Sequence, residues 1–387
     1  MCLVIVAAFV TSHASAYSTT RLNYQTRVCR LHFRKNYRMK GQSSAESLRA
    51  IAWKRLRKNS GAVIGMWIII VLVTIAVLAP ILAPMDPNTQ VLEYPSKPSL
   101  FRGNVLLKKN PVRTDEPFVM AIESFSVSGD TVRFIDPMKR SFALHTSAMF
   151  GNGVSEWHRE PLYILGTDKY GRDILSRIMY GARIAFLVAI ISETISIAIG
   201  ILLGALAGYF RGRVDDVIMW FTNVMWSFPT VLLVIAFSVI LGNGVWQTFV
   251  AIGLSGWVDL TRVVRGQFFS LREAEFIEAT RAFGFGTFRT IFRHLLPNTL
   301  GPITVIATAG FATAITLEAS LSFIGLGVQP PTASWGKMIQ DGIGFLFVGQ
   351  SLELVMYPCI VLGLTVYAFN LFGDGLRDAI DPKTMQR

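Results

Sequence analysis

The chain has 387 residues, of which 52% are hydrophobic and only 16% are charged. This balance is rare in soluble globular proteins and typical of chains whose solvent is lipid. The net charge of +12 could suit nucleic acid. However, Lys and Arg gather at the N-terminus, in one long loop and between apolar runs, a pattern that sets membrane topology. We therefore expect a membrane protein with no nucleic-acid partner.

Six segments are long and apolar enough to cross a bilayer, which takes about 20 residues in a helix. They lie near 62–83, 184–209, 217–241, 245–263, 303–326 and 354–372. The fourth is the weakest because it carries Asp259, and Pro229 is expected to bend the third. The sequence thus predicts an all-α membrane protein with six transmembrane helices.

The basic residues predict how these helices are oriented. The run 53–58 before the first helix contains four basic residues and places that end in the cytoplasm. Six crossings then return the C-terminus to the cytoplasm, together with the long loop 261–298. That loop carries Arg262, Arg265, Arg272, Arg281, Arg289 and Arg293. The turn at Gly242 on the other side has no Lys or Arg, which agrees with this orientation.

The chain divides into five expected parts. Residues 1–48 form an N-terminal extension, 49–83 a basic segment with the first helix, and 84–183 an external module. A transmembrane domain that includes the cytoplasmic loop 261–298 occupies 184–373, and 374–387 form a cytoplasmic tail. The external module is expected to be small and β-rich, because 126–135 alternates polar and apolar residues. Long loops are exempt from the charge rule, so its basic residues do not contradict the topology.

The N-terminal extension permits two interpretations. Residues 1–16 contain a short apolar stretch and end in Ala-Ser-Ala, as a cleaved signal peptide would. No positive residues precede that stretch, and cleavage would leave the basic segment 21–40 outside. The topology therefore favours an upstream extension, with the functional chain starting near Met39.

The long cytoplasmic loop holds the most informative pattern. Residues 278–283 are expected to form a helix, Gly284 a tight turn, and the next residues a second helix that ends at Pro297. Six apolar residues are expected to form one packing face: Phe283, Phe285, Phe288, Ile291, Phe292 and Leu295. Such a helix could fill a groove on a partner, or lie on anionic lipid. Composition alone does not decide between them.

The spacing of Glu278, Ala279, Gly284, Leu296 and Pro297 resembles the EAA loop of binding-protein-dependent ABC importer permeases. Thr280 departs from the second Ala of that pattern, and His294 stands where many members carry Ile. The run 293–298 is similar to the peptide and nickel branch. This resemblance implies that the loop docks a separate ATPase. The expected coupling residues are Glu278, Ala279, Arg281, Gly284, Arg293, His294, Leu296 and Pro297.

Two further stretches, 166–183 and 373–382, resemble the C-type permease of oligopeptide and dipeptide importers, as does the end of the first helix, 79–87. The resemblance covers most of the chain beyond Ala50, although 91–161 is longer than in typical members. It implies a type I importer architecture in a bacterial-type inner membrane. The implied partners are a second homologous permease, two ATPase subunits and an external solute-binding protein. Peptides are the leading cargo, with nickel complexes or another small solute as alternatives.

Two glutamates lie within expected membrane helices. Glu318 and Glu193 are costly in hydrocarbon unless they face a partner, a bundle interior or water. Each could line the translocation path or serve as a hydrogen-bonded group between helices. Glu318 ranks first because 317–327 also resembles the family. Gly200, Gly204 and Gly208, spaced by four, are expected to let another helix approach closely.

No residues for enzymatic chemistry are visible in the sequence. It contains no phosphate-binding Gly-x-x-x-x-Gly-Lys-Ser/Thr loop, so ATP and Mg²⁺ are expected on partner subunits and no cofactor on this chain. The five histidines lack metal-ligand spacing. A stand-alone secondary transporter or channel, with membrane carboxylates carrying ions, remains an alternative. So does a membrane-anchored sensor whose external module is the working part.

Overall fold

The computed structural model describes residues 48–110, 117–151, 153–242, 244–346 and 352–380. The expected N-terminal extension, including a start near Met39, lies outside these residues except for Leu48. Helix α2 (Leu48–Leu56) precedes the first membrane helix. Residues 374–380, expected in the tail, instead continue the last helix, α13 (Glu353–Ile380).

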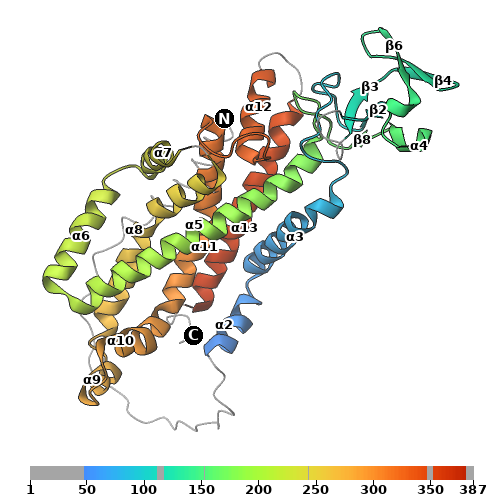
Figure 1. Ribbon diagram of the computed structural model, residues 1–387. Helices are drawn as coiled ribbons and strands as arrows, with labels where there is room; N and C mark the ends of the chain where they lie inside the picture. Colours follow the sequence, from blue (N-terminus) through green and yellow to red (C-terminus); the bar gives the residue numbers. More distant parts are fainter. Residues whose placement is uncertain (1–47, 111–116, 152, 243, 347–351, 381–387) are drawn as a thin grey trace.

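Long apolar helices dominate the described part of the chain (Figure 1). Four can cross a membrane by length and composition: α3 (Ser60–Leu82), α5 (Ile174–Phe210), a continuous helix over Thr287–Ile324, and α13. A fifth span is possible if the bent pair α6 (Gly212–Trp226) and α7 (Thr230–Leu241) counts as one. Helix α8 (Val245–Leu271) is long enough, at 27 residues, but less apolar. These helices confirm the all-α membrane architecture, with the fourth expected segment the weakest.

The third expected segment, 217–241, is two helices rather than one. Helices α6 and α7 meet at an angle of 92°. Pro229 stands immediately before α7, where the missing N–H of proline costs no helical hydrogen bond. The expected bend at Pro229 is therefore a complete break between two helices.

Helices α5 and α8 pack along the glycines of α5. A Cβ at Gly200 would lie 2.8 Å from Leu260, and a Cβ at Gly204 would lie 2.7 Å from the Thr261 carbonyl oxygen. A Cβ at Gly208 would lie 2.5 Å from Phe268. Side chains on these glycines would force the helices apart. The prediction of close approach is confirmed, and α8 is the partner.

The remaining helices surround this pair. Helix α13 packs against α3 and α11 (Leu296–Ile324), and α12 (Trp335–Leu346) fills the space between α5, α11 and α13. Buried Trp335 donates a hydrogen bond from Nε1 to the Ile178 carbonyl at 3.0 Å. This contact attaches α12 to the start of α5.

The described residues of the external module form three small antiparallel sheets, as its alternation predicted. Its strands are β1 (Phe101–Arg102), β2 (Val105–Lys108), β3 (Phe118–Ala121), β4 (Ser124–Ser128), β5 (Thr131–Ile135), β6 (Ser141–His145), β7 (His158–Arg159) and β8 (Leu162–Tyr163). The sheet orders are β1-β8, β3-β2-β7 and β4-β5-β6. The module has its own core around Leu106 and Trp157, the latter in the short helix α4 (Val154–Trp157). Figure 1 shows it at the opposite end of the bundle from α9 (Glu275–Ala282) and α10 (Thr287–Arg289).

Candidate functional site

The end of the bundle opposite the external module carries the helix-turn-helix expected from the sequence. Helix α9 ends at a glycine turn in which Gly284 has φ +72°. The Phe285 N–H donates to the Thr280 carbonyl at 3.1 Å, and the Gly284 N–H donates to the Arg281 carbonyl at 2.9 Å. This hydrogen bonding closes a helix end with a left-handed residue, where glycine carries no Cβ penalty.

The second helix does not end at Pro297, and that expectation is wrong. Helix α10 passes through a π-helical turn, η3 (Thr290–Leu295), directly into α11. Pro297 lies in the first turn of α11. The π turn changes the hydrogen-bond register, so proline occupies a position that needs no N–H donor. The helix-turn-helix is thereby continuous with a membrane helix.

The apolar residues of this loop divide between two surfaces instead of forming one face. Ile291 and Leu295 are buried together with Ile277 against Ala205 and Val264 of the bundle. On the other side, Phe283 and Phe288 are 78% and 74% exposed, and Phe292 is also exposed. We call the exposed set Phe283, Phe288 and Phe292 the aromatic surface. Its side chains meet no partner within the described chain that would bury them.

The aromatic surface is surrounded by positive charge. Arg281, Arg289 and Arg293 are exposed, and Arg289 lies over the Phe285 ring at 4.3 Å. Burial, together with the charges of Arg281 and Arg211, lowers the pKa of Arg272. The structure thus brings all the expected coupling residues to this end: Glu278, Ala279, Arg281, Gly284, Arg293, His294, Leu296 and Pro297.

Arginines also fix the base of this helix-turn-helix, a role that the sequence did not reveal. Arg211, in the turn after α5, donates to Glu273 at 2.8 Å and to the Phe269 carbonyl at 3.1 Å. Arg265 of α8 forms an ion pair with Asp215 of α6. These bonds join α5, α6 and the end of α8, and they therefore fix the position at which the helix-turn-helix begins.

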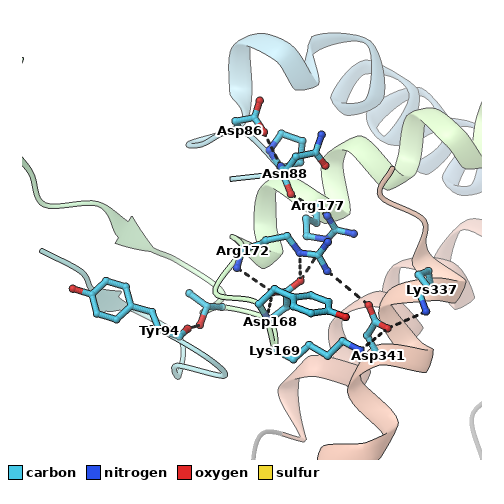
Figure 2. A network of polar contacts seen from close by, with 12 residues as sticks. Asp86, Asn88, Tyr94, Asp168, Lys169, Arg172, Arg177, Lys337 and Asp341 are labelled. Atoms are coloured by element: carbon cyan, nitrogen blue, oxygen red, sulfur yellow. Dashed lines mark hydrogen bonds and ion pairs between the residues drawn. The ribbon is translucent and has the colours of Figure 1, made fainter. Parts of the chain in front are cut away.

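A second polar cluster lies at the start of α5, beside the external module (Figure 2). Asp168 accepts a hydrogen bond from Arg172 Nε at 2.6 Å and forms an ion pair with Arg177 at 3.7 Å. Arg172 also reaches Asp341 of α12 at 3.7 Å, and Lys169 pairs with Asp341 at 3.1 Å. Both arginines are buried. The stretch 166–177 therefore locks α12 to α5, a role that its sequence alone did not indicate.

The surroundings favour the charged form of Lys169 and the neutral form of Asp173. Burial acts to lower the pKa of Lys169, but the hydrogen bond and charge of Asp341 outweigh it, and the pKa is raised above its usual value. Burial raises the pKa of Asp173, against hydrogen bonds from Ser176. Asp173 caps α5 by accepting from the Ser176 N–H at 2.7 Å.

The two membrane glutamates occupy different environments. Glu318 is buried, and its Oε1 accepts hydrogen bonds from Ser322 at 2.7 Å and Ser334 at 2.8 Å. Glu193 instead lines a cavity of about 310 Å³ between α5, α8, α11 and the break between α6 and α7. Glu318 is absent from the lining of this cavity. Of the two residues, Glu193 is therefore the one that faces a cavity, and Glu318 is the one satisfied by hydrogen bonds within the fold.

Comparison with known proteins agrees with this arrangement. Residues 200–386 match the family model of the binding-protein-dependent transport system inner membrane component. Residues 47–98 match the N-terminal TM domain of oligopeptide transport permease C. These two regions carry the helix-turn-helix and the first membrane helix, respectively.

Similar proteins extend the match along the chain. The dipeptide transport system permease DppC of Bacillus subtilis is 35% identical over 332 residues, covering 86% of this chain and 85% of the relative. DppC of Lactococcus lactis is 32% identical, covering 87% and 90%. OppC of Haemophilus influenzae, an oligopeptide permease, is 42% identical, covering 58% and 71%. The two long matches must include part of the external segment 91–161.

Among solved structures, the inward-facing methionine ABC transporter MetNI aligns with 54% of this chain and 98% of that chain, at 19% identity and a TM-score of 0.45. A similarity this low supports no argument about the fold. The family model and the long DppC matches do carry a conclusion. This chain belongs to the family of binding-protein-dependent transport system inner membrane components, and it is a permease subunit of an ABC transporter.

Proposed function

We propose that this permease imports di- or oligopeptides, together with a second homologous permease, two ATPase subunits and an external solute-binding protein. Its N- and C-termini lie in the cytoplasm, on the same side as the helix-turn-helix. ATP and Mg²⁺ bind to the ATPase subunits. The cargo assignment rests on relatives whose names specify dipeptide or oligopeptide transport.

One observation carries the coupling role: the helix-turn-helix is anchored on one side and exposed on the other. Ile277 and Leu295 are fully buried, whereas Phe283 and Phe288 are largely exposed. Large aromatic side chains beside arginines are typical of residues that dominate protein interfaces. A helix that presents such residues suits a groove on a partner. Anionic lipid explains the arginines, but it does not explain the anchoring of the opposite face.

The anchoring also supports a route for mechanical coupling. Ile277, Ile291 and Leu295 pack against residues of α5 and α8, including Ala205 and Phe268. The second helix of the helix-turn-helix, α10, continues through the π turn into α11 without a break at Pro297. Movement of the docked loop would therefore shift three membrane helices together, because a packed core moves as a unit. ATP-driven closure of the ATPase pair would provide that movement.

Affinity purification of the full-length chain, coexpressed with its cellular partners, tests the docking role. We expect wild type to co-purify an ATPase that mass spectrometry identifies. The double variant Phe283→Ser/Phe288→Ser should lose it while keeping the thermal midpoint of the wild type. Phe142→Ser, which changes an exposed phenylalanine on the external module, is the matched control and should retain the ATPase.

If the double variant retains the ATPase, the aromatic surface is not the docking site. If wild type captures no ATPase, the stand-alone transporter becomes the better hypothesis. Uptake of a radiolabelled dipeptide by membrane vesicles, with and without ATP, then separates these two cases. An importer requires ATP, whereas a secondary transporter is driven by an ion gradient.

A further inference from the structure

The cavity that Glu193 lines has the size of a small-molecule site. Its volume of about 310 Å³ falls at the lower end of the range for ligand pockets, roughly 300–1,000 Å³. The broken backbone around Phe228 and Pro229 forms one wall. Non-helical backbone at membrane depth is tolerated where it lines a cavity, and discontinuous helices often border transport sites.

Glu193 is a buried carboxylate without a counter-ion. Its side chain is 7% exposed, and no ion pair or hydrogen bond joins it to the described residues. Gly310 of α11 provides the space it occupies, because a Cβ there would collide with the Glu193 carboxylate. A carboxylate in this position is costly unless a cation or a hydrogen-bond donor accompanies it.

The cavity wall presents hydrogen-bond acceptors. Ser192 donates its hydroxyl proton to the Phe249 carbonyl at 2.8 Å, and Ser196 donates to the Gly253 carbonyl at 2.9 Å. Ser255 donates to Ala251 at 2.8 Å. These protons are engaged, so the hydroxyl oxygens offer lone pairs to a ligand. A primary ammonium group complements such a wall because it has three donors and no acceptor.

Among the described residues, no positively charged side chain lines the cavity beside Glu193. The serine bonds of α5 to α8 place Glu193 level with about residue 250 of α8, so Arg262 lies roughly 18 Å farther along that helix. Arg262 is also held over the Trp226 ring and donates to Asn223 at 2.8 Å. Within the described residues, no group of three or more His, Cys, Asp or Glu could hold a metal ion. The chemistry thus suits an organic cation better than a metal.

We propose that Glu193 binds the N-terminal ammonium group of a peptide in transit, inside the cavity between α5, α8, α11 and the α6–α7 break. This inference rests on the proposed peptide transport. The carboxylate balances the ammonium charge at membrane depth, and the serine oxygens accept hydrogen bonds from its remaining N–H groups. Phe228 borders the same space and provides aromatic surface for a cation, whereas the Trp226 ring is already covered by Arg262.

Saturation-transfer NMR on the full-length chain in nanodiscs tests this site without the ATPase. The probes are alanylalanine and N-acetyl-alanylalanine, which differ in the ammonium group. We expect wild type to bind alanylalanine, and Glu193→Gln to bind it at least about tenfold more weakly, as for other lost charge pairs. N-acetyl-alanylalanine should bind weakly to both proteins.

Two further variants keep the test decisive. Gly310→Ala retains the glutamate but displaces its carboxylate, so it should weaken alanylalanine binding too. Glu275→Gln changes an exposed glutamate of α9, far from the cavity, and should have no effect. The proposal is overturned if wild type fails to bind alanylalanine, if Glu193→Gln binds it unchanged, or if acetylation makes no difference. Failure of ATPase capture, followed by uptake that needs no ATP, would refute the importer and leave this binding result intact.

Discussion

The two ends of this permease use charged residues in opposite ways. At the external end, Arg172 and Arg177 are buried and directed at Asp168, so the charges satisfy one another inside the fold. At the opposite end, which carries the helix-turn-helix, Arg281 and Arg289 are exposed beside the aromatic surface. The first arrangement holds α12 against α5. The second leaves charge and apolar area available to another protein.

This difference shows how burial separates structural from interaction residues. Removing one member of a buried pair leaves an uncompensated charge and destabilises the fold. Removing an exposed aromatic side chain costs the free monomer little, but it costs the complex a contact. Substitutions at the two ends should therefore separate stability from partner binding. The expected loss of stability decreases from Asp168→Ala through Ser334→Ala and Gly284→Ala to Phe288→Ala.

Asp168→Ala should have the largest effect on stability. It leaves Arg177 buried without its ion-pair partner and Arg172 with only the more distant Asp341, a loss of about 3–5 kcal/mol for a broken buried pair. Thermal unfolding in detergent, followed by circular dichroism, measures the change. Asp130→Ala, at an exposed turn of the external module, is the control and should unfold like wild type. An unchanged midpoint for Asp168→Ala would mean that the network does not brace α12.

Ser334→Ala should cost less, because it removes one of two donors to Glu318. The lost hydrogen bond leaves a buried acceptor partly unsatisfied, at about 1–3 kcal/mol. The same unfolding assay applies, with Ser126→Ala on the exposed face of β4 as control. If Ser334→Ala matches its control, Ser322 alone satisfies Glu318.

Gly284→Ala tests the turn between the two arms of the helix-turn-helix. Its φ of +72° disfavours any residue with a Cβ, by roughly 1–2 kcal/mol. A Cβ at Gly284 meets open space, so the cost is conformational rather than steric. Gly286→Ala is a close control, because Gly286 has φ −65° and equally open surroundings. If the two variants are equally stable, the positive φ of Gly284 does not disfavour a Cβ there. Amide hydrogen exchange in α9 would show whether any loss of stability is confined to this helix.

Phe288→Ala should change stability least and binding most. Because Phe288 is 74% exposed, the free energy of unfolding should stay within about 0.5 kcal/mol of wild type. If Phe288 is a central contact, ATPase affinity should fall about thirtyfold, which corresponds to about 2 kcal/mol. Surface plasmon resonance with the purified ATPase measures this affinity. Loss of stability without loss of affinity would assign Phe288 to the fold.

Local signals in the sequence determined the class of the protein and much of its coupling end. The apolar runs predicted membrane helices, because crossing hydrocarbon demands length and hydropathy that a short window reveals. Gly200, Gly204 and Gly208 predicted close helix packing, and the α5–α8 contact confirms it. Gly284 predicted the turn because glycine, which lacks a Cβ, adopts a positive φ without a steric penalty.

Only the tertiary structure decided which distant residues meet. Asp341 joins the network of Arg172 across more than 150 residues of chain, and no local pattern predicts such a pairing. Glu193 and Glu318 look alike in sequence, yet serines satisfy Glu318 whereas Glu193 faces a cavity. The path of the chain through Pro297 likewise depended on a π turn beside it. Hydropathy and backbone preference act within a few residues, whereas the partner of a buried charge depends on how whole helices pack.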